Sequence, residues 1–194
     1  MTDRIPPNLR FLIPRDYESP WYLGEDSFDL IHIRMALGGV QHWAALYQTA
    51  FRHLKPGCGI LEHVEIDLQP RCDDGTLTDD LMLSRWYGWL DDATQRALHP
   101  IAYPPNIREM LQLQGFVDIE ETVIRLPLNE WVINDPEQRI LGRWYCLGMT
   151  HWLEALSLAP FTRVYNWPVA DVHRLVKEVT DQMGRRSIHA YNNL

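Results

Sequence analysis

Apolar residues recur along the chain with two different periods, which predict strands and amphipathic helices in alternation. Short apolar runs and alternating positions predict strands over residues 9–13, 28–33, 59–66 and 116–126. Spacings of three and four predict helices over 43–54, 79–98, 106–114 and 136–156, and a last helix that begins at Trp167-Pro168. This order predicts an α/β fold with a mainly parallel sheet, and the aromatic-rich helices after Glu130 form a cap over one edge.

The length and charge of the chain narrow the classes of protein and partner. With 194 residues and no repeat, it fits a single domain, with a core at about 8–128 and a helical cap with C-terminal helices at about 129–194. A formal charge of −8 without a Lys/Arg cluster excludes nucleic acid as an expected ligand. The predicted partners are a small metabolite or another protein.

Cysteine usage and hydropathy indicate an intracellular protein, either cytoplasmic or nuclear. The three cysteines stand at unrelated spacings, which fits neither a disulfide framework nor a zinc site. The N-terminal residues lack the apolar segment of a secretory signal, and no apolar stretch is long enough to span a membrane. We therefore expect no membrane partner.

The strand over 59–66 carries the clearest candidate chemistry. Glu62, His63 and Glu65 place an imidazole that titrates near neutral pH between two carboxylates, a set that could perform general acid–base catalysis. An ordinary polar strand rim is the alternative. A metal face of His63, Glu65 and Asp67, joined by the 72–74 segment, mixes hard and soft ligands without a zinc spacing, so no metal is predicted.

A ligand pocket is expected where the strand over 28–33 ends. His32, Arg34 and Met35 follow that strand, and α/β folds bind ligands at the carboxyl ends of their strands. Aromatic residues of the cap could complete an apolar pocket, although at helical spacing they could equally form core. The cap aromatics are Trp86, Trp89, Trp144, Tyr145, Trp152, Phe161, Tyr165 and Trp167. The predicted substrate-binding residues are His32, Arg34, Met35, Trp43, Trp86, Tyr145 and His189.

Several segments resemble the LaeA-like fungal methyltransferases, in the same order and over nearly the whole chain. They are residues 14–21, 23–32, 53–57, 64–67, 70–75, 156–161 and 188–192. The resemblance implies a class I methyltransferase fold, S-adenosylmethionine (SAM) as the family's cofactor, a role in fungal secondary metabolism, and velvet proteins as partners within the family. It also places Asp16 and Glu18 in an acidic loop near the adenine, if SAM is bound.

The sequence departs from that family at both ends. Family members begin with a strand, a glycine-rich turn, a helix and a second strand that ends in an acidic residue, whereas here only residues 1–7 precede the segment that resembles the family's third strand. The glycine pairs Gly38-Gly39 and Gly57-Cys58-Gly59 do not match the phosphate- or cofactor-binding pattern. We therefore expect an incomplete Rossmann-like fold that lacks the first βαβ unit and the last strand, and no bound cofactor.

The missing first strand would leave the strand over 28–33 with an open edge. Unpaired backbone groups on an apolar strand favour pairing with another chain, so we expect a homodimer or a heteromer through this edge. Three functions remain open: a cofactor-free isomerisation, dehydration or cyclisation of a small metabolite; a regulatory subunit without catalysis; and methyl transfer with a cofactor site completed in trans or lost from an incomplete gene sequence.

Overall fold

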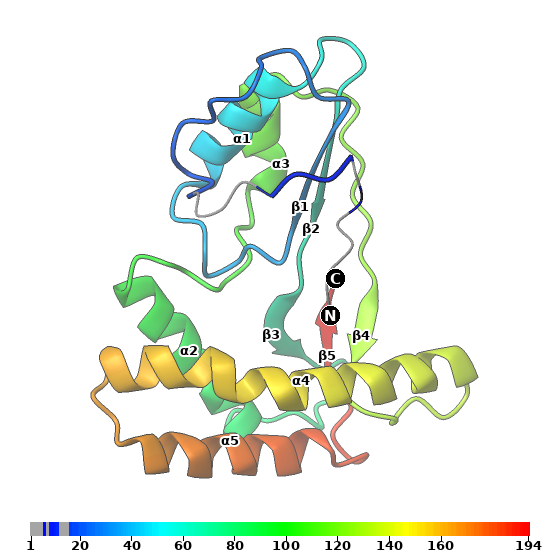
Figure 1. The fold of residues 1–194 in the computed structure, drawn as a ribbon. Helices are drawn as coiled ribbons and strands as arrows, with labels where there is room; N and C mark the ends of the chain where they lie inside the picture. Colours follow the sequence, from blue (N-terminus) through cyan, green and yellow to red (C-terminus); the bar gives the residue numbers. More distant parts are fainter. Residues whose placement is uncertain (1–5, 7, 12–15) are drawn as a thin grey trace.

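The computed structural model describes residues 6, 8–11 and 16–194. Their helices and strands form two parts that lie one above the other (Figure 1). The elements, in chain order, are β1 (Leu30–Arg34), α1 (Trp43–His53), β2 (Ile60–Val64), β3 (Asp67–Arg71), α2 (Met82–Arg96), α3 (Ile107–Gln114), β4 (Arg125–Pro127), α4 (Pro136–Arg163), α5 (Val169–Met183) and β5 (Tyr191–Asn193).

The first part is a parallel pair of strands with helices on one face. β1 and β2 pair in register from Leu30 opposite Ile60 to Arg34 opposite Val64. Alternate side chains point to opposite faces, so Ile31 is buried whereas Leu30 and Ile60 are 52% and 61% exposed. α1 and α3 cover the buried face (Figure 1). The other face is called the open face here, and it consists of Leu30, His32, Arg34, Ile60, Glu62 and Val64.

The second part is an antiparallel sheet packed against helices. β5 lies between β3 and β4 in the order β3-β5-β4. The backbones of Ile124 and Leu194 exchange two hydrogen bonds of 2.8 Å and so extend the β4–β5 pairing beyond the strands themselves. α2, α4 and α5 pack against one another around buried Trp86, Leu153 and Phe161, and Figure 1 shows α4 running alongside α5.

Each part has its own hydrophobic cluster, and Leu37 packs against both. α2 belongs to the cluster of the C-terminal helices although it precedes residue 128. The chain passes from one part to the other directly, since only Glu65 and Ile66 separate β2 from β3. The junction therefore lies at the carboxyl ends of β1 and β2.

The α/β class is confirmed, and the predicted helices are all present. The last helix begins after Pro168, which supplies its N-cap. α4 runs on to Arg163, past the predicted end at 156, and contains Pro160. Asp135 begins this helix, because its carboxylate accepts hydrogen bonds from the N–H groups of Glu137 and Gln138.

The strand predictions need correction. The sheet is not mainly parallel, because β3, β5 and β4 pair in antiparallel fashion. Residues 116–123 form no strand, since no neighbouring strand pairs with them in the described part of the chain; the pairing begins at Ile124, just before strand Arg125–Pro127. The strand over 9–13 lies partly outside the described residues, and 9–11 are not in a strand. The Tyr191-Asn192 motif, expected before a final strand, itself belongs to strand β5.

Candidate functional site

An apolar cavity of about 290 Å³ lies at the junction of the two parts. It is at the carboxyl ends of β1 and β2, the position where open α/β sheets hold their ligands. Residues from both parts line it, so that α4 closes a cavity that begins at β1. The lining residues are Met35, Leu37, Glu65, Ile66, Leu68, Ile101, Trp152, Ala155 and Leu156.

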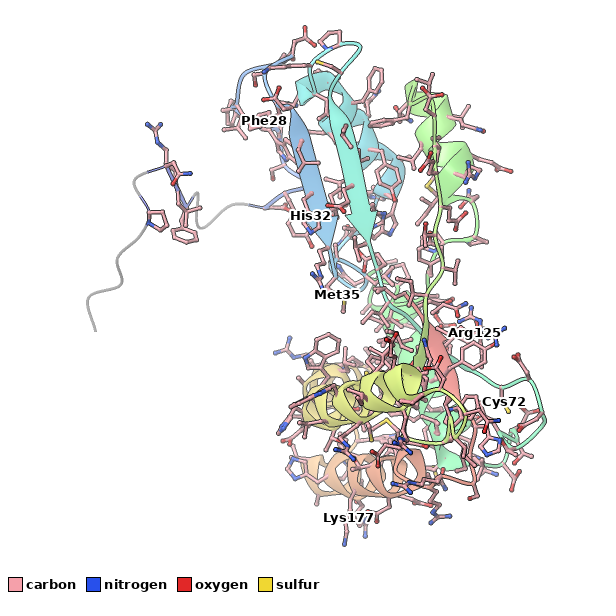
Figure 2. The ribbon with its side chains drawn as sticks, turned by 90° about the vertical axis from the view of Figure 1, so that its right-hand side faces the viewer. Phe28, His32, Met35, Cys72, Arg125 and Lys177 are labelled. Atoms are coloured by element: carbon pink, nitrogen blue, oxygen red, sulfur yellow. The ribbon has the colours of Figure 1, made fainter. Side chains whose placement is uncertain are left out.

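Met35 occupies a strained position at the mouth of this cavity. Its φ of 55° lies in the left-handed region, which L residues other than Asn and Asp rarely adopt. Its N–H donates a 3.1 Å hydrogen bond to the carbonyl of Val64, so the β1–β2 pairing fixes this conformation. Figure 2 shows Met35 at the end of β1, beyond His32 and toward the second part. Strained backbone of this kind is concentrated at ligand sites.

Glu65 is the charged group of the cavity, and its oxygens have partners. It is 7% exposed and accepts hydrogen bonds from the N–H groups of Ala36 at 2.7 Å and Leu37 at 3.3 Å. His63 Nε2 lies 3.0 Å from the carboxylate, and His63 Nδ1 lies 3.0 Å from the hydroxyl of Tyr47. A carboxylate only accepts, so Nε2 carries the proton and the Tyr47 hydroxyl donates to Nδ1. This chain of bonds holds the loop that follows β1.

The three predicted catalytic residues do not share one site. Glu62 points to the open face, where a 2.6 Å ion pair joins it to His32. Glu62 and His32 are 56% and 41% exposed, whereas His63 and Glu65 lie buried beneath the opposite face. Arg34 also points to the open face. The set therefore divides into an exposed pair and a buried structural network.

Most of the predicted substrate-binding residues lie outside the cavity. Trp43 is buried against His63 with ring centroids 4.8 Å apart. Trp86 is in the core, where its indole N–H donates a 2.9 Å hydrogen bond to Ser157 Oγ. The Tyr145 hydroxyl donates to Asn192 Oδ1 at 3.0 Å, and burial raises the pKa of Tyr145. Of the seven residues, Met35 alone is among those that line this cavity.

His189 belongs to a polar cluster of the second part that also contains Cys72, Asp74 and Thr76. Its Nδ1 is hydrogen-bonded to Asp74, and its ring stacks on Trp131. Hydrogen bonds from Cys72, His189 and Thr76 lower the pKa of Asp74. This cluster ties the loop after β3 to the segment before β5.

Asp73 and a second cavity lie next to that cluster. Asp73 accepts hydrogen bonds from the hydroxyl of Tyr191 at 2.8 Å and from Arg125 at 2.6 Å, and these bonds lower its pKa. Tyr191 and Arg125 also line a cavity of about 520 Å³, together with apolar residues of the 123–132 segment.

Asp16 and Glu18 use their carboxylates within the fold. Asp16 accepts hydrogen bonds from the Glu18 N–H at 2.9 Å and the Ser19 hydroxyl at 3.2 Å, as in a local turn. Glu18 accepts from the N–H groups of Gln41 at 3.0 Å and His42 at 2.8 Å, just before α1. Glu18 therefore satisfies backbone donors that the start of α1 would leave free.

Gly39 and Gly59, one from each glycine pair, pack against neighbouring residues of the chain itself. A Cβ on Gly39 would lie 2.3 Å from the Tyr17 hydroxyl, and one on Gly59 would lie 2.8 Å from Leu54 Cβ. Both glycines thus allow close packing of protein against protein, whereas the glycines of a dinucleotide-type loop allow backbone to approach a ligand. Among these residues, no His, Cys, Asp and Glu side chains group in threes to hold a metal, and no helix is long and apolar enough to cross a membrane.

A family described as methyltransferase domain matches residues 6–121 of the chain. The chain belongs to this methyltransferase family. Within it, the LaeA-like likeness is confirmed by the secondary metabolism regulator LAE1 of Cochliobolus heterostrophus, which is 61% identical over 193 residues. LaeA of Monascus pilosus is 46% identical, and the protein-methionine methyltransferase laeA of Emericella nidulans is 44% identical, each over 191 residues.

The LaeA-like chain spans about half to three-fifths of the length of these curated relatives. The alignments cover 97–99% of it but only 62%, 51% and 50% of the three relatives, in the order given. A solved phosphoethanolamine N-methyltransferase 2 of Haemonchus contortus, bound to phosphomonomethylethanolamine and S-adenosylhomocysteine, is 16% identical with a TM-score of 0.42. That likeness covers 89% of this chain and 33% of the solved one.

Family membership changes the expectation about the cofactor. Methyltransferases of this family use a SAM-type cofactor, so the expected absence of a cofactor and the cofactor-free reaction have no support in the comparisons.

The part of the cavity lining that α4 supplies was not identified from the sequence. Trp152 was recognised only as one of eight cap aromatics, and Ala155 and Leu156 gave no signal. Trp152 is 41% exposed. Its exposure depends on how α4 packs against the rest of the chain, which helical spacing in the sequence does not reveal.

Proposed function

We propose that this chain is the acceptor-binding part of a SAM-dependent methyltransferase that regulates fungal secondary metabolism. The observation that carries the proposal is the apolar cavity at the carboxyl ends of β1 and β2. The family supplies the reaction class, and the relatives, which are secondary metabolism regulators, supply the regulatory role.

The acceptor we assign to the cavity is a methionine side chain of a protein. The Emericella relative is a protein-methionine methyltransferase, and an unbranched thioether suits a mostly apolar cavity of about 290 Å³. A thioether reacts through a lone pair on sulfur and loses no proton when it becomes a sulfonium, so it needs no general base. This agrees with His63 and Glu65, whose hydrogen bonds are already used within the fold.

The charge of the product gives two lining residues a function. A sulfonium carries a positive charge, which a carboxylate and the face of a tryptophan ring both stabilise. Glu65 and Trp152 line the same cavity. We assign them to the stabilisation of the charge that develops on the acceptor sulfur, while the remaining apolar residues exclude water.

SAM supplies the methyl group when it is bound, and we assign its binding to a part of the protein that packs on the open face. Leu30 and Ile60 are exposed there, and within the described residues β1 has a strand neighbour on one side only. A strand edge and an apolar face of this kind favour a further layer of structure. Of the three functions left open by the sequence, this proposal takes methyl transfer with a cofactor site completed by another segment, which packs at the open face and free edge of β1.

Filling the cavity tests the acceptor site directly. N-acetyl-L-methionine methylamide serves as the probe, and NMR of the Trp152 indole follows its binding to the purified chain. We expect dissociation in the millimolar range for the unmodified chain, because one side chain makes few contacts. Ala155→Trp fills the cavity and abolishes the shift of the indole signal.

Ala159→Trp is the matched control, because Ala159 is also exposed on α4 but lies one turn beyond the lining. It should bind the probe like the unmodified chain, with circular dichroism confirming that both variants fold. Absence of binding by the unmodified chain, or equal binding by the two variants, would contradict the acceptor site.

A further inference from the structure

α4 has two apolar faces, and its own chain covers only one of them. Met149, Leu153 and Phe161 are buried in the core of the second part. On another side of the helix, Ile140, Trp144 and Leu147 are 55%, 64% and 49% exposed. The buried apolar residues of α4 therefore pack in the core, whereas the exposed apolar residues have no packing partner among the described residues.

Together with the exposed His151, the apolar residues Ile140, Trp144 and Leu147 form a continuous line, called the α4 stripe here. Their spacings of four, three and four residues are those of the seam between two packed helices. α4 has 28 residues and so is about 42 Å long, and Figure 1 shows it on the outside of the second part. A second helix can therefore lie along the stripe.

The charges beside the stripe select an antiparallel copy of the same helix. Arg139 and Arg143 flank its N-terminal end, and Glu154 stands one turn beyond His151 at the other end. In an antiparallel pair centred near Leu147, Glu154 of each copy lies beside the two arginines of the other. A parallel pair would place like charges together. The antiparallel order also opposes the two helix dipoles.

These charged groups are already oriented by the fold. Arg143 is paired with Glu130 at 2.6 Å, and Glu154 is paired with His173 of α5 at 3.3 Å. Both remain largely exposed, at 68% and 56%, so a second copy can reach them. The self-complementary pattern of one face is what a closed two-fold interface requires.

We propose that the chain forms a homodimer through the antiparallel packing of α4 against α4 of a second copy. The seam places Leu147 near the two-fold axis, with Trp144 of each copy against His151 of the other. This interface is distinct from the open face, which the proposed function assigns to the SAM-binding part.

Sedimentation equilibrium of the purified chain tests the dimer. We expect a dimer at about 100 µM, and Trp144→Glu should raise its dissociation constant at least about tenfold because it places a charge in the seam. Leu113→Glu is the control, since Leu113 is 82% exposed on α3, and it should leave the dissociation constant unchanged. Circular dichroism checks that each variant folds.

Charge exchange tests the direction of packing. Arg139→Glu and Glu154→Arg should each weaken the dimer, and the double variant should dimerise more tightly than either single variant, because it again places opposite charges together at positions 139 and 154. A chain that stays monomeric at about 100 µM overturns the proposal. If Trp144→Glu leaves the dimer intact, the interface lies elsewhere and the proposal is wrong. The proposal is also wrong if the double variant dimerises no more tightly than the single variants.

Discussion

The carboxylate of Glu65 accepts hydrogen bonds from two backbone N–H groups of the loop after β1 and from His63. These donors are partly buried, and the carboxylate replaces the water that they would otherwise bind. Glu62, three residues earlier, has one partner on an exposed face. Both residues are glutamates of the same short segment, but Glu62 lies within β2 and Glu65 follows it, and their environments separate their functions.

Glu65→Ala should lower the free energy of unfolding by roughly 1–3 kcal/mol, because it removes the acceptor of the partly buried N–H groups of Ala36 and Leu37. Glu62→Ala should change it by less than about 1 kcal/mol, as expected for an exposed ion pair. Urea unfolding of both variants measures the difference. Equal effects would show that Glu65 does not hold this loop.

Strand alternation correctly places Leu61, His63 and Glu65 on one side of the chain, but it does not reveal their partners. The N–H groups of Ala36 and Leu37 reach Glu65 only because Met35 turns into the left-handed region at the end of β1. A methionine gives no sequence signal for that conformation, which Gly, Asn or Asp would have given. The acid–base hypothesis therefore could not be separated from the structural one in sequence.

The β1–β2 pair is covered on one face and uncovered on the other. Ile31 is 8% exposed beneath α1, whereas Ile60 is 61% exposed on the open face. Both are isoleucines of the β1–β2 pair, so substitutions at the two positions can be compared directly. The comparison tests which face of the pair is covered by residues of this chain.

Ile31→Lys should destabilise the chain by about 3–5 kcal/mol, because it places an ammonium group in the cluster around α1. Ile60→Lys should change the stability by less than about 1 kcal/mol, because the side chain already meets water. Thermal and urea unfolding provide the comparison. A large loss of stability in Ile60→Lys would mean that the open face is covered by the chain's own residues.

Periodicity predicted the helices better than the strands. A helix satisfies its backbone locally, so the spacing of Trp43, Leu46 and Ala50 is sufficient evidence for α1. A strand needs a neighbour, and β3 and β5 are paired across more than 100 residues of chain. Residues 116–123 carry apolar residues at strand-like positions, yet no strand pairs with them among the described residues, so the strand prediction was wrong there.

At the scale of the molecule, the cavity exists because two separately packed parts meet. Met35 and Leu37 come from the end of β1, and Trp152 and Leu156 come from α4, more than 100 residues later. The LaeA-like family and the α/β class could be read from motifs and alternation. The position of α4 over the strand ends could not, since it depends on how α2, α4 and α5 pack together.

The central claim is that this chain binds the methyl acceptor, and that a further part of the protein, packed on the open face, is needed to bind SAM. Calorimetric titration with SAM tests it, using the chain alone and the chain mixed with the portion of the Cochliobolus relative that it does not match. We predict no binding by the chain alone at about 100 µM and a dissociation constant on the order of micromolar for the mixture. Ile60→Lys should weaken binding in the mixture at least about tenfold. Micromolar binding by the chain alone, or no binding by the mixture, would contradict the account.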